Sequence, residues 1–167
     1  MKVENSASEE AVRIADELTR AIENDPWHGD SVSVILRDVT YEMAPAKPGA
    51  AVHSIWEIVR HMTAWTGEVE RRLDGHPAGL PEEGDWPALS GATEKHWRQD
   101  VDALMRAHDR LRDKLKMVSD ASLFAPTRDP RNRPTGAGVT GYVLLHGLAQ
   151  HHAYHAGQIA LLKRLLA

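Results

Sequence analysis

The sequence of 167 residues contains no cysteine. This absence excludes thiolate nucleophiles, disulfide bonds and thiolate-bound metals, so any metal must be held by histidine, carboxylate or water. The chain has no apolar run of transmembrane length, and its N-terminus, MKVENSASEE, lacks the apolar core of a signal peptide. We therefore expect a cytoplasmic protein.

Several functional signatures are also missing. The chain has no HExxH motif, no phosphate-binding glycine loop, no nucleophile elbow and no Glu-x-x-His pair of the ferritin type. The formal net charge of −4 argues against a nucleic-acid or membrane-surface role. We therefore expect neither a nucleic acid nor a membrane as a partner.

Helical periodicity dominates the chain, and no strand alternation competes with it. The length suits a single domain over residues 1–167. The expected fold class is all-α, with a four-helix bundle as the natural packing. The pattern predicts a helix from Ser6 to Asp25 and a short helical piece at 31–37. It predicts three further helices, at 54–73, 93–118 and 140–167, and two long loops, at 76–92 and 119–139.

Two capping boxes support the predicted helix starts, Ser6-Ala-Ser-Glu9 and Ser54-Ile-Trp-Glu57. Glu57 also precedes a histidine by four residues, so it suits either the cap or a carboxylate that orients that histidine. In the last helix, Gly147 and Gly157 each cost about 1 kcal/mol relative to alanine. Close helix approach or access for a ligand would justify them.

The last helix carries the motif HHAYH at residues 151–155. His151 and His155 are four residues apart on the apolar stripe, so their side chains share one face. Two neutral imidazoles in this arrangement can bind one divalent metal. The alternative is a pair of core histidines that bond to neighbours or buried water, because a buried imidazole needs partners. His152 is one step off the stripe and is expected at a flank or in solvent.

His61 lies on the apolar side of the 54–73 helix, where by itself it would be a packed core histidine. Together with the pair at 151 and 155 it becomes the best candidate for a third ligand. Three nitrogens would leave positions open for water or substrate. His108 also falls on an apolar stripe. It could be a fourth ligand, but a proton carrier or a hydrogen-bonded core histidine is favoured. Gln158 either bonds to His155 or merely ends the polar patch.

Other polar and aromatic residues have two interpretations each. Arg128, Arg131 and Arg133 either contact an anionic substrate or, as we favour, solvate their loop. Trp86 and Trp97 either line the mouth of the site or pack in the core. The remaining histidines are assigned to structure or surface: His28, His53, His76, His96 and His146.

These features resemble the DinB-like (DinB/YfiT-like) family. The matching stretches are HSIWEIVRHMTAWTGEVERRLDG (53–75) and LLHGLAQHHAYHAGQIALLKRLL (144–166), supported by PWHG near residue 27 and DWP at 85–87. The resemblance implies a four-helix bundle of up-down-down-up topology with 76–92 as the crossover loop. It also implies a divalent metal, nickel or zinc, held by the three histidines that match the motifs, His61, His151 and His155. The family has a polar, frequently acidic residue where His152 stands.

The resemblance further implies a metal-dependent enzyme that acts on a small molecule. The reaction would be that of a hydrolase or of a transferase that uses a low-molecular-weight thiol. A non-catalytic metal-binding or dimerisation module and a metal-free bundle are the alternatives. Exposed helix faces favour a homodimer.

Overall fold

The computed structural model describes residues 8–132 and 138–167, and this part of the chain is helical. It contains no strand, apart from an isolated bridge between Pro126 and Thr140. The all-α class expected from the sequence is therefore confirmed. The helices are α1 (Glu9–Ile22), α2 (Val32–Leu36), α3 (Ile55–Leu73), α4 (Glu94–Leu115), α5 (Asp120–Phe124) and α6 (Gly141–Leu166). Among these described helices, none combines the length and the apolar character that crossing a membrane requires.

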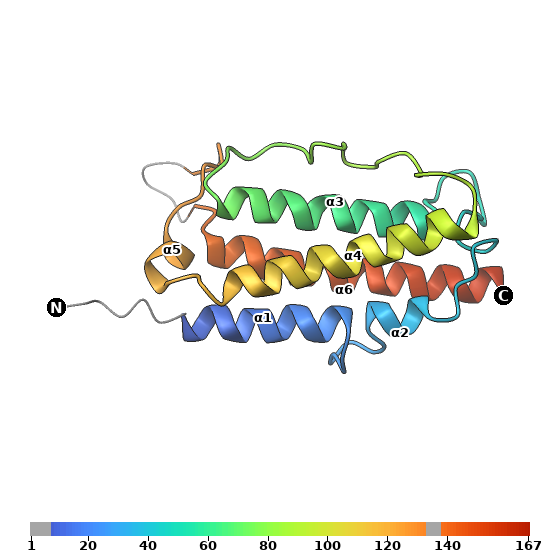
Figure 1. Ribbon diagram of the computed structural model, residues 1–167, viewed down its shortest axis with the longest axis horizontal. Helices are drawn as coiled ribbons and strands as arrows, with labels where there is room; N and C mark the ends of the chain where they lie inside the picture. The colour runs from blue at the N-terminus through green and yellow to red at the C-terminus, as the bar shows by residue number, and fades with distance from the viewer. Residues whose placement is uncertain (1–7, 133–137) are drawn as a thin grey trace.

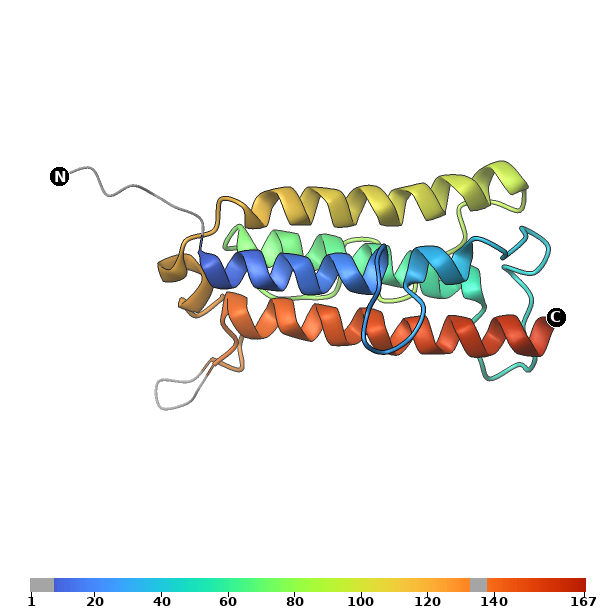
Figure 2. The same cartoon turned by 90° about the horizontal axis from the view of Figure 1, so that it is seen from below.

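Four long helices lie side by side and form the bundle (Figure 1). Helix α1 packs against α4 and α6, and α3 packs against the same two helices from the opposite side (Figure 2). The colours of Figure 1 show that α1 and α6 run in one direction and that α3 and α4 run in the other. The connection 76–92 runs along the length of the bundle to join α3 to α4.

The core consists of two hydrophobic clusters separated by a polar layer. Ile58 and Met62 of α3 and Ile159 of α6 belong to one cluster. Val69 of α3 and Leu148 of α6 belong to the other. Buried polar side chains lie between and beside these residues, among them His61, Thr66, Glu68, His108, His152 and His155. The packing of α3 against α6 thus places histidines from distant segments at one level of the bundle.

Helix caps fix most of the element starts. Ser54 Oγ accepts from the Glu57 N–H and Glu57 Oε2 accepts from the Ser54 N–H, at 3.2 and 2.7 Å, which confirms the second capping box. The cap of α1 is Ser8, whose Oγ accepts from the Ala11 N–H at 3.1 Å. Ser6, the expected cap, lies outside the described residues. Within the predicted loop 119–139 the chain forms the short helix α5.

Candidate metal centre

His61, His151 and His155 meet between α3 and α6. The Nε2 atom of His151 lies 2.9 Å from Nε2 of His61 and 3.1 Å from Nε2 of His155. Each residue offers a nitrogen within 4.8 Å of those of the other two. One helical turn separates the two histidines of α6, and α3 supplies the third from across the interface. The structure thus brings together the three residues that the sequence singled out.

Hydrogen bonds on the far side of two rings fix their tautomers. His61 Nδ1–H donates to the Asp85 carbonyl at 2.6 Å, and His155 Nδ1–H donates to Gln158 Oε1 at 2.6 Å. Because a neutral imidazole carries a single N–H, the Nε2 atoms of both rings carry lone pairs. Of the two alternatives for Gln158, the hydrogen bond to His155 is the one that the structure contains.

The cluster contains too few protons to satisfy its own contacts. His151 Nε2–H can donate to one neighbour, so the other close N···N contact would join two lone pairs. Burial lowers the pKa of His61, lowers that of His151 to about 3 and that of His155 to about 4, so an additional proton does not bind near neutral pH. Two nitrogens that bind one Zn²⁺-like ion at about 2.0–2.1 Å lie roughly 3 Å apart. The donor set therefore fits a divalent metal.

A family comparison agrees with this geometry. A family model described as the DinB superfamily matches residues 27–159, which is most of the chain and includes all three histidines. The chain belongs to the DinB superfamily. Comparisons with curated proteins and with solved structures found no significant match.

In this DinB-superfamily chain the connection 76–92 closes over the histidine cluster. Trp65 Nε1–H donates to Asp85 Oδ1 at 2.7 Å, which ties the connection to α3. The indole of Trp86 stacks on His61, with ring centroids 4.0 Å apart, and also on His53, at 3.4 Å. Trp86 therefore lines the centre. Trp97, in contrast, packs in the core.

The prediction that His152 lies at a flank of the helix or in solvent is wrong. This side chain is fully buried. Thr66 donates its hydroxyl proton to the Met62 carbonyl at 2.8 Å, so His152 Nε2–H donates to Thr66 Oγ1 at 3.2 Å. The reason is that α6 packs against α1, α2 and α3 at once, so much more than one stripe of its surface is interior.

His108 does not belong to the three-histidine cluster. It is 1% exposed, and no described residue bonds to either ring nitrogen. His108 is therefore a buried core residue, as one of the two favoured interpretations has it, without a hydrogen bond to a described residue. The closest carboxylate oxygen, on Glu23, lies 3.7 Å from Nε2. Burial lowers the pKa of His108 to about 4, so the ring is neutral at pH 7.

The structure decides between the alternatives left open for Glu57 and for Gly147. Glu57 caps α3 and pairs with Lys47 at 2.8 Å, and it makes no contact that would orient His61. A Cβ atom at Gly147 or Gly157 would meet nothing within 4 Å, so close helix approach does not explain either glycine. Gly147 instead lines a cavity, as expected for ligand access.

Two cavities flank the histidine cluster. One has a volume of about 590 Å³ and reaches His151, and the other has a volume of about 390 Å³ and reaches His155. Trp65 lines the first cavity, whereas Trp86 and Tyr154 line the second. A small molecule therefore has room on either side of the centre.

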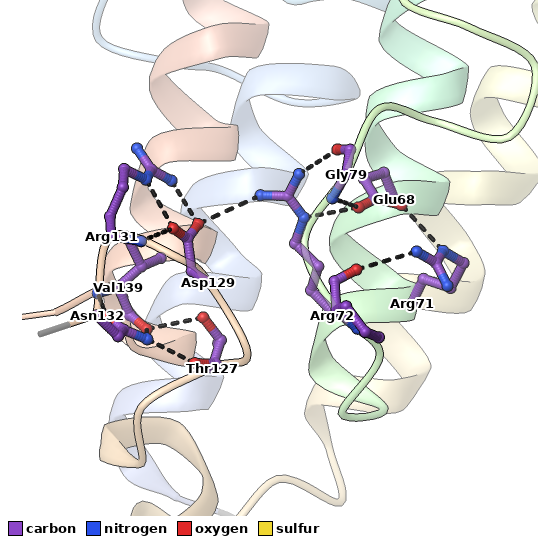
Figure 3. A network of polar contacts seen from close by, with 10 residues as sticks. Glu68, Arg71, Arg72, Gly79, Thr127, Asp129, Arg131, Asn132 and Val139 are labelled. Carbon is purple, nitrogen blue, oxygen red and sulfur yellow. Dashed lines mark hydrogen bonds and ion pairs between the residues drawn. The ribbon is translucent and has the colours of Figure 1, made fainter.

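Beside the first cavity lies an ionic network with buried carboxylates, which the sequence analysis did not predict (Figure 3). The side chain of Glu68 is 0% exposed and accepts from Arg71 Nε–H at 3.0 Å and from Arg72 Nε–H at 2.8 Å. Asp129, which lines the same cavity, accepts two hydrogen bonds from the Arg131 side chain. Arg131 thus belongs to an ion pair, Arg128 is exposed, and Arg133 lies outside the described residues.

Proposed function

We propose that this protein is a metal-dependent enzyme in which His61, His151 and His155 hold one divalent ion, nickel or zinc. The observation that supports the proposal is the proton deficit of three neutral imidazoles in direct contact. When bound, such an ion supplies a Lewis acid that polarises an electrophile and lowers the pKa of a water or thiol. Three nitrogen ligands leave coordination positions open for that chemistry.

The surrounding residues orient the ligands and shield them from solvent. The Asp85 carbonyl and Gln158 hold two of the rings by their Nδ1–H groups. Trp86 covers a face of His61 and keeps water from that side. With a cavity on each flank, this arrangement suits a small-molecule substrate, and the reaction class is hydrolysis or transfer of a low-molecular-weight thiol.

Calorimetric titration of chelator-stripped protein with Zn²⁺ and Ni²⁺ tests the metal centre. We expect one ion per chain. We expect His61→Ala to weaken binding by more than roughly 100-fold, which exceeds the usual effect of losing an outer hydrogen-bond partner. His28→Ala is the matched control, since His28 is exposed, and His152→Ala should weaken binding far less. Equal losses in the His61 and His152 variants would contradict the ligand assignment.

Two assays separate the reaction classes. Hydrolysis of an activated ester without added thiol supports a hydrolase, and conjugation of an electrophile that requires a low-molecular-weight thiol supports a transferase. In either case we expect the metal-stripped protein and His151→Ala to lose the activity while they remain folded. A loss that only follows unfolding would favour the non-catalytic module. The homodimer stays a prediction, which the molecular mass in solution tests.

A further inference from the structure

We propose that the cavity beside His151 binds a small organic monoanion, an apolar body with one carboxylate, and that Arg72 binds the carboxylate. Binding of the carboxylate by Arg72 does not require the metal, although His151 lines the same cavity. Only its use as a substrate site rests on the proposed function.

The walls of the cavity are mainly apolar. Its volume of about 590 Å³ lies within the range of about 300–1,000 Å³ that is typical of small-molecule sites. The charged side chains in the lining are those of Arg72, Asp129 and Arg131, and His151 provides the link to the metal centre. The apolar lining includes Trp65, Val69, Val143, Leu144 and Leu148.

Arg72 is buried, yet part of its guanidinium has no protein acceptor. The side chain is 8% exposed, its Nε–H donates to Glu68, and its Nη2–H donates to the Gly79 carbonyl at 2.6 Å. Nη1 makes no hydrogen bond to a described residue, and the nearest carboxylate oxygen, on Asp129, is 3.9 Å away. Figure 3 draws this contact between Arg72 Nη1 and Asp129 as an ion pair, and at 3.9 Å it is longer than a hydrogen bond. A ligand acceptor in the cavity would satisfy these N–H groups.

The charge around this contact favours an anion. Asp129 is already engaged by two hydrogen bonds from the Arg131 side chain, at 2.9 and 2.7 Å, which lower its pKa to about 2. Glu68 is shared by Arg71 and Arg72. The network therefore has three arginines for two carboxylates, an excess of one positive charge. One ligand carboxylate balances this excess, and its bond to a guanidinium is of the strong, charge-assisted kind.

Calorimetric titration with 4-phenylbutyrate and with its neutral amide tests the site in metal-stripped and zinc-loaded protein. We expect the carboxylate to bind roughly tenfold more tightly than the amide, as a charge-assisted hydrogen bond predicts. Arg72→Gln should abolish this preference. Arg71→Gln is the matched control, because Arg71 bonds to the same Glu68 but does not line the cavity. Equal affinities in the unmodified protein, or a preference that survives Arg72→Gln, would overturn the proposal.

A second pair of variants keeps the test decisive if Arg72→Gln fails to fold. Gly147→Leu adds a side chain at the cavity wall, where a Cβ meets nothing within 4 Å. We expect it to weaken both probes by roughly tenfold or more through lost space. Gly157→Leu, on the same helix and equally open, should leave both affinities unchanged. Unchanged binding in Gly147→Leu would place the probes elsewhere and overturn the proposal.

The metal-stripped and zinc-loaded titrations separate this inference from the proposed function. Arg72-dependent binding of 4-phenylbutyrate by a chain that takes up no zinc would support the cavity and contradict the metal centre. Zinc uptake without a carboxylate preference would support the metal centre and contradict the cavity proposal. Tighter 4-phenylbutyrate binding after zinc loading would support both, because the positive charge of the ion attracts an anion next to His151.

Discussion

At the scale of single residues, the three histidines differ in what holds their rings. His61 and His155 each donate an Nδ1–H to an oxygen, whereas no described residue bonds to Nδ1 of His151. The first two rings are therefore oriented by hydrogen bonds. The orientation of His151 depends on packing between its neighbours.

Gln158→Leu tests the role of one such bond. The change leaves His155 Nδ1–H without its acceptor, so the tautomer that presents Nε2 is no longer favoured. We expect zinc affinity to fall by roughly 10–100-fold, measured by competition with a chelator. Gln150→Leu, at an exposed position of α6, is the control and should have no effect. An unchanged affinity in Gln158→Leu would show that the bond is dispensable.

His108 should make the stability of the metal-free protein depend on pH. Burial lowers its pKa in the folded chain to about 4, below the ordinary value of 6.5 for histidine, so the unfolded chain binds the proton more readily. Stability is therefore lost as the pH falls from about 6.5 to about 4, by as much as about 3 kcal/mol for this group. Urea denaturation at pH 7 and at pH 4.5 measures the loss.

The variant His108→Leu isolates this contribution from that of the other buried histidines. We expect a smaller stability difference between the two pH values in this variant than in the unmodified protein. His28→Leu, at an exposed position, should retain the full difference. The same pH dependence in all three proteins would exclude His108 as a source.

The shared face of His151 and His155 could be predicted because i and i+4 spacing places two side chains on one side of a helix. His61 could be predicted from its place on the apolar side of the 54–73 helix and from the family motif. The burial of His152 could not. Periodicity gives the direction of a side chain relative to its own helix, whereas burial depends on how many other helices surround that helix. Since α6 contacts α1, α2 and α3, a residue one step off the stripe is still interior.

At the scale of elements, replacing a glycine by alanine should have opposite effects on stability inside α6 and just after α3. Gly157 lies inside α6 in open surroundings, whereas Gly75 follows α3 with a φ of +84°. We expect Gly157→Ala to raise the free energy of unfolding by about 0.5–1 kcal/mol, through helix propensity and a less flexible unfolded chain. Gly75→Ala should lower it, because alanine is strained at positive φ. Urea denaturation measures both, and a loss of stability in Gly157→Ala would contradict the expectation.

The long helices could be predicted from periodicity and caps, and their contacts with the connections could not. Asp85 and Trp86 reach the cluster because the connection 76–92 is tied to α3 by the bond from Trp65. Arg72 forms a long ion pair with Asp129, although 57 positions separate them in the sequence and no periodic pattern relates them. Irregular segments carry no repeating signal, so their partners emerge only from the three-dimensional structure.

At the scale of the whole molecule, the candidate centre lies in the polar layer between two hydrophobic clusters. Helices α3 and α6 contribute to both clusters and to the layer between them. A metal that joins His61 of α3 to the two histidines of α6 would therefore link these helices at mid-core. Binding there should stabilise the entire bundle, because unfolding separates the ligands.

Zinc should raise the melting temperature of the metal-stripped protein. A ligand at 100 times its Kd that binds only the folded state adds about 2.7 kcal/mol. For a chain of this size, about 2–4 °C per kcal/mol corresponds to a rise of roughly 5–10 °C, measurable by circular dichroism. Mg²⁺ should have little effect, because it prefers oxygen ligands. His155→Ala should abolish the rise and His28→Ala should retain it. A rise that survives His155→Ala would mean that zinc stabilises the bundle from another place.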